Sequence, residues 1–407
     1  MGRYGLLGEK LGHSFSPRIH AMLCGYEYGL VELERPQLEG FLASTELDGM
    51  NVTIPYKKDV LPYCAHLSDA VKRIGSANTL VRGADGWHAH NTDYFGFRYM
   101  VESCGCEPKG KKAVVLGAGG ASVAVVTALE DMGAEPVVVI SRKGEDNYGN
   151  LQRHEDAKIV VNATPVGMYP NTGAAAVSLD AFPKCEAVFD LVYNPARTKL
   201  IMDAESRGLV CRSGLSMLVA QAHKAAELFT GSSIPKERIE EILSVLEKET
   251  ENIILIGMPG SGKSSVGKML SQLTGRHFID ADEEFERVNS ISAGDMIRAQ
   301  GEDAFRRAET ALLSELGKRS GLIIATGGGC VTREENYPLL HQNGVIFCLT
   351  RSLEKLPTEG RPLSQQNSLL ELYAKRRPMY ERFADHMTDN DRGSIADVAV
   401  QILEAFK

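Results

Sequence analysis

Short apolar runs recur along the chain, and each of them ends at a glycine or a polar residue. Such runs are typical of strands in a parallel sheet, which neighbouring helices cover on both faces. We expect strands of this kind at residues 113–116, 136–140, 158–161, 187–189, 253–256, 322–325 and 345–349. Helical patterns lie between many of them, and the alternation of the two predicts an α/β protein.

The run at 253–256 leads into a glycine-rich loop. Residues 257–264, GMPGSGKS, fit the pattern G-x-x-x-x-G-K-[ST] in full, and a helix-forming run follows. In such loops the backbone N–H groups and the N-terminus of the next helix bind phosphate oxygens. We expect Lys263 to reach the outer phosphates and Ser264 to offer its hydroxyl to Mg²⁺. The loop therefore predicts a site for a nucleoside triphosphate.

A second glycine-rich turn follows the run at 113–116. Gly117 and Gly119 match the first two positions of the dinucleotide fingerprint G-x-G-x-x-G, and Ser122 replaces the third glycine. The next strand ends at 141–143, Ser-Arg-Lys, where a cofactor with a free ribose 2′-hydroxyl usually meets Asp or Glu. A cationic pair suits a 2′-phosphate, which favours NADP over NAD. The alternative is a basic pair on the surface without a ligand.

Polar residues also gather at the expected strand ends and helix starts of the first half. A helix cap explains Ser16, whereas Ser14 and Ser16 together also suit a small carboxylate. His88 and His90 are spaced to lie on one face of a strand, but no third metal ligand is evident. Further polar residues occur at 51–58, 76–81 and 91–93. Turns and helix caps account for them equally well as a binding site would.

Comparable residues follow the strands of the second half. Asp280 and Asp282 end one strand and suit either Mg²⁺ or a substrate hydroxyl. Arg306 and Glu309 lie three residues apart, on one face of a helix. The glycines at 327–329 let a ligand lie against bare backbone. Solvated helix faces are the alternative for the arginines.

Length, charge and cysteine usage narrow the class of protein. A chain of 407 residues predicts two or three domains, and a net charge of −8 argues against a general binder of nucleic acids or membranes. The opening MGRYGLLGEKLGHS lacks the apolar segment of a signal peptide. The eight cysteines are scattered without zinc-site spacing, so we expect reduced thiols in a cytoplasmic protein. The charged stretch at 247–251 is interpreted as a short linker.

Over about residues 2–247 the chain resembles the shikimate dehydrogenase family. The motifs that carry the resemblance occur in order as SFSP, NVTIPYK, SANTL, NTD, GAGGAS, NATPVGM and GLSMLVAQA. The resemblance implies a substrate-binding domain at 1–96 and 215–249 and an NADP-binding Rossmann domain at 97–214. It also implies that Lys57 and Asp93 are the catalytic pair.

The same resemblance implies two sets of binding residues. The set implied for shikimate is Ser14, Ser16, Thr53, Asn78, Asp93, Tyr193 and Gln221. The set implied for NADP is Gly117, Ala118, Gly119, Gly120, Ala121, Ser122, Ser141, Arg142, Lys143, Leu191, Gly214 and Met217. Two departures stand out. Ser216 replaces the usual second glycine of GLGML, which we expect to narrow the approach to the nicotinamide, and the connection from 143 to 158 is short for a strand–helix return.

Nearly all of 252–407 resembles shikimate kinase, through GMPGSGKSS, DAD, FRRAE, TGGG, GRPL and RRPMY. The resemblance implies a P-loop kinase domain with a parallel sheet. It implies a catalytic role for Lys263 and for Arg361, the latter on a lid over the transferring phosphate, and it places Mg²⁺ at Ser264. The implied ATP contacts are Gly260, Ser261, Gly262, Lys263, Ser264 and Ser265, and the implied shikimate contacts are Asp282, Arg306, Gly328, Gly329 and Arg376.

Both halves therefore imply the same small molecule. The prediction is a bifunctional cytoplasmic enzyme of chorismate and aromatic amino acid biosynthesis. It reduces 3-dehydroshikimate with NADPH and phosphorylates shikimate with ATP and Mg²⁺ to shikimate 3-phosphate, without nucleic-acid or membrane partners. One alternative is a quinate/shikimate oxidoreductase fused to a small-molecule kinase, against which Arg142 counts. The other is a catalytically inactive nucleotide-sensing regulator, against which Lys57, Asp93, Lys263 and Asp282 count.

Overall fold

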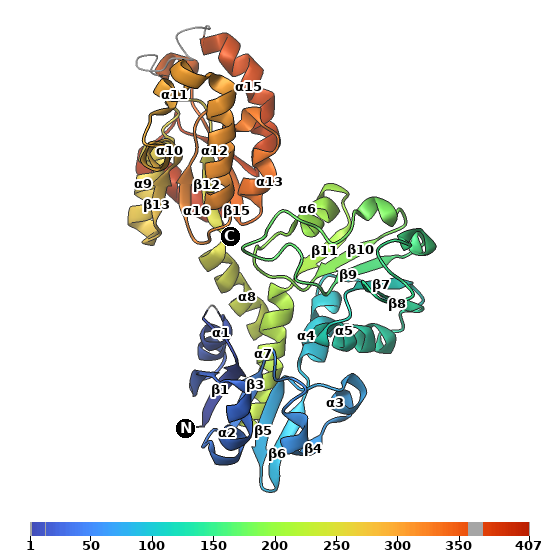
Figure 1. The fold of residues 1–407 in the computed structure, drawn as a ribbon. Helices are drawn as coiled ribbons and strands as arrows, with labels where there is room; N and C mark the ends of the chain where they lie inside the picture. The colour runs from blue at the N-terminus through green and yellow to red at the C-terminus, as the bar shows by residue number, and fades with distance from the viewer. Residues whose placement is uncertain (1, 13, 357–368, 407) are drawn as a thin grey trace. The chain divides into compact units, whose positions relative to one another are not determined.

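The computed structural model describes residues 2–12, 14–356 and 369–406, and the chain divides into two compact units (Figure 1). The first unit comprises Met1–Met168, Ala174–Asn194 and Leu200–Leu243. The second comprises Tyr169–Gly173, Pro195–Lys199 and Ser244–Lys407. Within the described ranges, no helix combines the length and the apolar character that a membrane span requires.

The first unit opens with a six-stranded mixed sheet in the order β2-β1-β3-β5-β6-β4, in which β5 runs antiparallel to β3 and β6. Its strands are β1 (Arg3–Gly8), β2 (Glu27–Glu32), β3 (Gly49–Val52), β4 (Cys64–Leu67), β5 (Thr79–Gly83) and β6 (Gly86–His90). The helices of this part are α1 (Ser16–Leu23), α2 (Leu38–Ser44) and α3 (Asp69–Ile74). Trp87, the only tryptophan of the chain, is buried there and donates its indole N–H to the carbonyl of Leu42 at 3.0 Å.

A five-stranded parallel sheet follows, in the order β11-β10-β9-β7-β8. Its strands are β7 (Ala113–Leu116), β8 (Val137–Ile140), β9 (Ile159–Asn162), β10 (Ala187–Asp190) and β11 (Val210–Ser213). The side chains of β7 alternate between two separate apolar clusters, with Ala113 and Val115 in one and Val114 and Leu116 in the other. Both faces of the strand are therefore covered, which is why its sequence is apolar throughout.

Two helices connect the sheets of the first unit. α4 (Asp93–Glu102) leads from the mixed sheet to the parallel one, and α7 (Leu215–Thr230) returns and packs against α4 and α1 (Figure 1). Tyr4 of β1 stacks on Phe229 of α7 and donates its hydroxyl to the carbonyl of Phe229 at 2.9 Å. The remaining helices of this part are α5 (Gly120–Asp131), α6 (Lys199–Ser206) and the start of α8 (Glu237–Thr250), whose residues from Ser244 belong to the second unit. A late segment of the chain thus completes the core around its first strand.

Two connections test the interpretation of the sequence. Between β8 and β9, where every residue is described, the helical segment is the short 3₁₀ turn Leu151–His154, in agreement with the short connection expected there.

The interpretation of 247–251 as a linker is wrong, because α8 continues through Thr250 and β12 begins at Asn252. Glu and Lys are strong helix formers, and the stretch has no Gly or Pro to end the helix earlier.

The second unit contains a five-stranded parallel sheet in the order β13-β14-β12-β15-β16. The strands are β12 (Asn252–Ile256), β13 (Phe278–Asp280), β14 (Ile323–Ala325), β15 (Gly344–Thr350) and β16 (His386–Asp389). The helices are α9 (Lys263–Thr274), α10 (Ala281–Asn289), α11 (Ala293–Gln300), α12 (Glu302–Gly317), α13 (Asn336–His341), α15 (Leu369–Phe383) and α16 (Ile395–Ala405). β12 alternates as β7 does, with Ile254 and Ile256 in one apolar cluster and Ile253 and Leu255 in another. The predicted α/β fold is confirmed in both units.

Candidate active sites

In the first unit, the residues predicted to bind the substrate and the predicted catalytic lysine line one cleft of about 870 Å³. They come from several elements and comprise Ser14, Ser16, Thr53, Lys57, Asn78, Asp93, Tyr193 and Gln221. Four residues predicted to contact NADP line the same cleft, namely Ala121, Leu191, Gly214 and Met217. The fold therefore places the substrate residues next to part of the dinucleotide site.

An ion pair lies in this cleft. The Lys57 ammonium donates to Asp93 Oδ2 at 2.6 Å, and both side chains are mostly buried. The other carboxylate oxygen of Asp93, Oδ1, accepts from the Asn78 amide at 2.9 Å. Asp93 begins α4 and Lys57 lies in the turn after β3, so two separate segments hold the pair. The arrangement holds an ammonium proton donor beside the cleft.

A buried amide and hydroxyl network supports the ion pair. The Asn78 amide group donates to Thr92 Oγ1 at 3.0 Å, and its carbonyl oxygen accepts from the Thr92 backbone N–H at 2.6 Å. Thr92 also donates to the Gln221 side chain at 3.3 Å, which ties α7 to this network. Asn51 also lines the cleft, bonded to Thr79 and Tyr28, and it is absent from the predicted set. It opens the NVTIPYK motif, so its position in the sequence was the available signal.

Hydroxyl groups and a helix start also line the cleft. Ser16 begins α1, and its backbone N–H donates to the hydroxyl oxygen of Ser14 at 3.2 Å. Tyr193 lies near Phe15, with ring centroids 5.8 Å apart, and burial raises the pKa of its phenol. A protonated phenol and two hydroxyls are donors that suit a substrate carboxylate.

The glycine turn after β7 presents bare backbone at a helix start. Gly119 precedes the first residue of α5, and a Cβ on Gly119 or Gly120 would meet open space. Ser122, in place of the third glycine, is buried and donates its hydroxyl to the carbonyl of Gly119 at 2.7 Å. Exposed N–H groups at the start of a long helix fit the pyrophosphate of a dinucleotide.

The predicted cationic pair lies beside this turn. β7 and β8 pair in register at Leu116 and Ile140, so the turn and residues 141–143 follow neighbouring strand ends. Arg142 and Lys143 are both exposed. Neither lines the substrate cleft described above, as expected for groups that would bind the far end of a dinucleotide.

The loop before α7 explains why Gly214 is required. A Cβ at Gly214 would lie 2.1 Å from the carbonyl oxygen of Leu191, so any side chain would displace one of the two cleft-lining segments. Ser216 is buried and donates its hydroxyl to the carbonyl of Ser213 at 3.3 Å. Around this helix start, the described residues that line the cleft are Gly214, Met217 and Leu218. Ser216 is not among the described residues that line the cleft, and its effect on the approach of the nicotinamide stays a prediction.

In the second unit, a cleft of about 750 Å³ brings together the glycine loop and the predicted shikimate contacts. Gly260, Gly262, Lys263, Ser264 and Ser265 line it, together with Asp282, Arg306, Gly328, Gly329 and Arg376. Ser261 is fully buried, and its carbonyl accepts from the Asn390 side chain at 2.5 Å. Arg361 lies outside the described residues.

The glycine loop holds its lysine and serine in defined places. The Lys263 ammonium donates to the carbonyls of Gly257 and Met258 at 3.0 and 3.1 Å. Ser264, in the first turn of α9, donates to Asp280 Oδ2 at 2.5 Å. A hydroxyl and a carboxylate at this distance fit Mg²⁺ as oxygen ligands. Asp280 is absent from the predicted kinase contacts, although the sequence pattern indicated Asp280 and Asp282 together as candidates for Mg²⁺ or a substrate hydroxyl.

The three glycines at 327–329 leave room for charged side chains. A Cβ at Gly329 would lie 2.2 Å from a guanidinium nitrogen of Arg306, and one at Gly327 would lie 2.8 Å from both Asp282 and Glu309. Arg306 and Glu309 are buried and paired at 2.7 Å. Burial raises the pKa of Glu309, while the Arg306 charge acts in the opposite direction.

Two further arginines complete this cleft. Arg376 is buried and donates to the carbonyl of Gly328 at 3.1 Å. Arg351 lines the cleft directly after β15 and donates to the carbonyl of Gly260 at 3.2 Å. Arg351 was not predicted, and its place at a strand end of the sheet was the signal in the sequence.

Comparisons with known proteins cover both parts of the chain. A family model described as shikimate kinase matches residues 259–407, and one described as the shikimate dehydrogenase substrate binding domain matches residues 6–80. The NADP(+) shikimate dehydrogenase of Clostridium perfringens strain 13 is 36% identical over 268 residues, which are 61% of this chain and 99% of the relative.

Solved structures agree with the dehydrogenase match. A chorismate mutase/shikimate 5-dehydrogenase fusion protein from Clostridium acetobutylicum has 34% identity and a TM-score of 0.58, over 61% of this chain and 98% of its own. Shikimate 5-dehydrogenase from Thermus thermophilus, in complex with NADP(H) and shikimate, has 32% identity and a TM-score of 0.55, over 60% of this chain and 98% of its own.

The folds and clefts define two nucleotide-dependent α/β enzymes in one chain, an oxidoreductase followed by a phosphotransferase. The chain belongs to the shikimate dehydrogenase family, and a shikimate kinase domain is fused C-terminal to the dehydrogenase part. The predictions of both activities and of NADP, ATP and Mg²⁺ as cofactors are confirmed, and the substrates are shikimate and related small molecules. The role of each site residue stays a prediction.

Proposed function

We propose that this cytoplasmic chain carries out two consecutive reactions, reduction of 3-dehydroshikimate to shikimate and phosphorylation of shikimate to shikimate 3-phosphate. The observation that carries the proposal is the Lys57–Asp93 pair in a cleft that also contains residues of the dinucleotide-binding half. All eight cysteines are free thiols, which supports a reducing compartment. We assign residues 1–96 and 215–249 to substrate binding, 97–214 to NADP binding and 252–407 to the kinase.

In the reductase site, the protein binds the substrate and moves one proton. Ser14, Ser16 and Tyr193 would hold the carboxylate, and NADPH supplies the hydride to the carbonyl carbon. The Lys57 ammonium would donate a proton to the carbonyl oxygen as the C–O π bond becomes a hydroxyl. Asp93 keeps the ammonium in position, and Asn78 fixes the carboxylate of Asp93 through its second oxygen.

In the kinase site, arginines would bind the substrate, and acidic residues would accept a proton and hold the metal ion. Arg306 and Arg376 would bind the shikimate carboxylate, since both residues line the cleft. Asp282 would accept the proton of the attacking hydroxyl, and Lys263 would stabilise charge on the phosphates. Ser264 and Asp280 would hold Mg²⁺, which neutralises charge on the phosphate oxygens.

The proposal is tested with two single variants in one coupled assay that contains 3-dehydroshikimate, NADPH and ATP. Lys57→Ala should lose NADPH oxidation but still phosphorylate added shikimate. Lys263→Ala should oxidise NADPH and accumulate shikimate without forming shikimate 3-phosphate. Loss of both activities in either folded variant would contradict the assignment of these residues to separate sites.

A further inference from the structure

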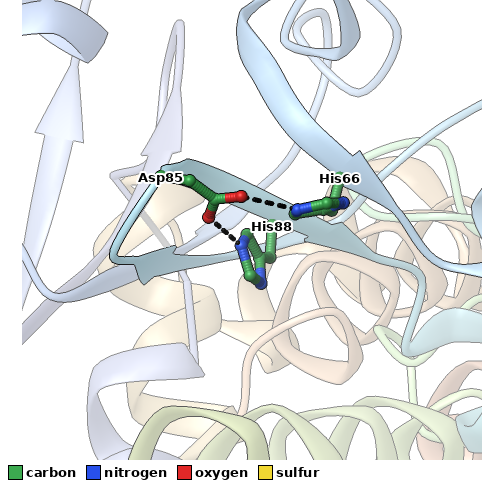
Figure 2. Close-up of side chains that lie close together, drawn as sticks. All are labelled: His66, Asp85 and His88. Carbon is green, nitrogen blue, oxygen red and sulfur yellow. Dashed lines mark hydrogen bonds and ion pairs between the residues drawn. The ribbon is translucent and has the colours of Figure 1, made fainter.

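A cluster of two histidines and one aspartate lies on the mixed sheet of the first unit. Figure 2 shows His66, Asp85 and His88 with their polar atoms turned toward one another. Asp85 Oδ2 lies 2.6 Å from His66 Nε2, and its Oδ1 lies 2.8 Å from His88 Nε2. One ligand atom from each of the three residues can be chosen so that all lie within 4.8 Å of one another. We call this set the His–Asp–His cluster.

The strand register explains how the two rings meet. β4 and β6 pair in parallel with His66 opposite His88, and the register shifts between Cys64 and His66. Trp87 and Ala89 of β6 point into the core, so His88 between them faces the other side of the sheet. The imidazole rings lie edge to face with centroids 4.7 Å apart.

The hairpin between β5 and β6 supplies the third group. Asp85 lies in this turn, directly beside the pair of strand ends Gly83 and Gly86. A Cβ at Gly83 would lie 2.4 Å from His88 Nε2, so the absence of a side chain at Gly83 makes room for the ring. Backbone register, turn and glycine thus converge on one arrangement of three ligand atoms.

We propose that the His–Asp–His cluster binds a divalent transition-metal ion of the Zn²⁺ type. Two imidazole nitrogens and one carboxylate oxygen are ligands that Zn²⁺ prefers, whereas Mg²⁺ and Ca²⁺ prefer oxygen alone. An ion at a tetrahedral site needs ligand atoms about 3.4 Å apart. The present contacts are shorter, and the side chains are accessible, so the ion would replace the shared protons after a small opening. Solvent would fill the fourth position.

The bound ion would fasten the edge of the mixed sheet. β4 is the last strand in the order β2-β1-β3-β5-β6-β4, and it pairs with β6 alone among the described strands. The ion would link β4 directly to the β5–β6 hairpin through side chains. It therefore stabilises the fold of the substrate-binding part and takes no part in either proposed reaction.

The test is calorimetric titration of the metal-free full-length protein with ZnCl₂, with reduced thiols and excess Mg²⁺ to occupy the phosphate loop. The wild-type protein should bind one equivalent of Zn²⁺ at the cluster, and it should unfold at a higher temperature with Zn²⁺ present. Variants of the three cluster residues should lose this equivalent. His66→Gln, Asp85→Asn and His88→Gln should each weaken this binding at least about tenfold. His386→Gln, at an exposed histidine of β16, is the matched control and should bind as wild type does.

A second probe reads the ligands themselves. Co²⁺ added to the wild-type protein should give visible absorption bands of a low-coordinate nitrogen and oxygen site, and the three cluster variants should lack them. The proposal is overturned if wild-type protein binds no Zn²⁺ equivalent that the cluster variants lose, or if the variants retain the wild-type affinity and Co²⁺ spectrum. Retained reductase turnover and NADPH affinity in the variants would show that each is folded.

Discussion

At the scale of single residues, several glycines matter because a side chain at their position would collide with a neighbouring group. Gly214 allows the backbone of Leu191 to approach, and Gly329 allows the Arg306 guanidinium to lie against the loop. The sequence could predict Gly329 as part of a bare surface but not which side chain would occupy the space. That partner comes from α12, and proximity between distant segments is a property of the fold.

Arg142 is predicted to select the cofactor. Arg142→Ala should raise the KM for NADPH far more than the KM for NADH, because only NADPH carries the 2′-phosphate. A lost charge-assisted contact costs roughly 1.5–3 kcal/mol, which is about 10- to 150-fold in affinity. Steady-state kinetics with both cofactors measures this, and Arg35→Ala, at an exposed arginine paired with Asp59, is the control. Equal effects on the two cofactors would show that Arg142 points elsewhere.

His20 is predicted to make the stability of the first unit depend on pH. It is fully buried, stacked on Tyr28, and its Nδ1 lies 2.6 Å from the hydroxyl of Tyr26. Burial lowers the pKa of His20 from 6.5 to about 3. The unfolded chain therefore binds this proton more readily, so stability is full above about pH 6.5 and is lost as pH falls toward 3.

The test compares wild type with His20→Phe, which keeps an aromatic ring. Between pH 7.5 and 4.5 the variant should lose about 2–3 kcal/mol less unfolding free energy than wild type. Urea unfolding followed by Trp87 fluorescence reports on the first unit, because Trp87 is the only tryptophan and is buried there. Parallel pH profiles for the two proteins would contradict the role of His20.

At the scale of elements, the sequence predicts strands best where both faces are buried. The runs at 113–116 and 253–256 correspond closely to β7 and β12. β2 was not predicted, because it is largely exposed at the edge of its sheet and has no clear alternation. β4 and β11 are also edge strands. Their pairing depends on neighbours that the local sequence does not specify.

The His–Asp–His cluster illustrates the same limit. The sequence suggested His88 with His90, since both lie on one strand at a spacing of two. The structure gives His88 different neighbours, His66 and Asp85, through the pairing of β4 with β6. A third ligand was not visible in the sequence because strand pairing, rather than sequence spacing, supplies it.

Asp280 has two roles at one junction, and a single substitution separates them. It caps α10 by accepting from the Asp282 N–H, and it lies against Ser264. Asp280→Asn should preserve the cap, because Asn is also a good N-cap, but should remove the charge that favours Mg²⁺. We expect an unchanged melting temperature and a kinase kcat at least about tenfold lower, with a higher Mg²⁺ requirement.

Kinase assays across a Mg²⁺ series, with calorimetric melting on the same samples, measure both effects. Asp397→Asn, in the capping box of α16, serves as a control and should leave the Mg²⁺ dependence unchanged. A fall in melting temperature of Asp280→Asn without a change in Mg²⁺ dependence would assign Asp280 to the cap alone.

At the scale of the whole molecule, the described part of each cleft lies within its own unit. The described residues that line the reductase cleft all belong to the first unit, and those that line the kinase cleft all belong to the second. Each cleft also carries its own donors for the substrate. Among the described residues, neither cleft is lined by a side chain of the other unit, so we expect shikimate to equilibrate with solvent between the two steps.

An isotope trap tests this expectation. The coupled reaction is started with unlabelled 3-dehydroshikimate in the presence of excess labelled shikimate, and early shikimate 3-phosphate is analysed by mass spectrometry. Free exchange predicts that labelled product dominates from the start. Product that remains mainly unlabelled would establish direct transfer and contradict the expectation.

The return of α7 to the first sheet has a consequence for the order in which the protein is made. The ribosome releases β1 to β6 first, yet Phe229, which stacks on Tyr4, is synthesised more than two hundred residues after that tyrosine. The mixed sheet therefore emerges without the α7 side chains that pack against Tyr4, and it waits while the whole parallel sheet is translated, at about 5–20 residues per second. We expect the apolar surface left open during this interval to make nascent chains that stop before Leu215 bind chaperones.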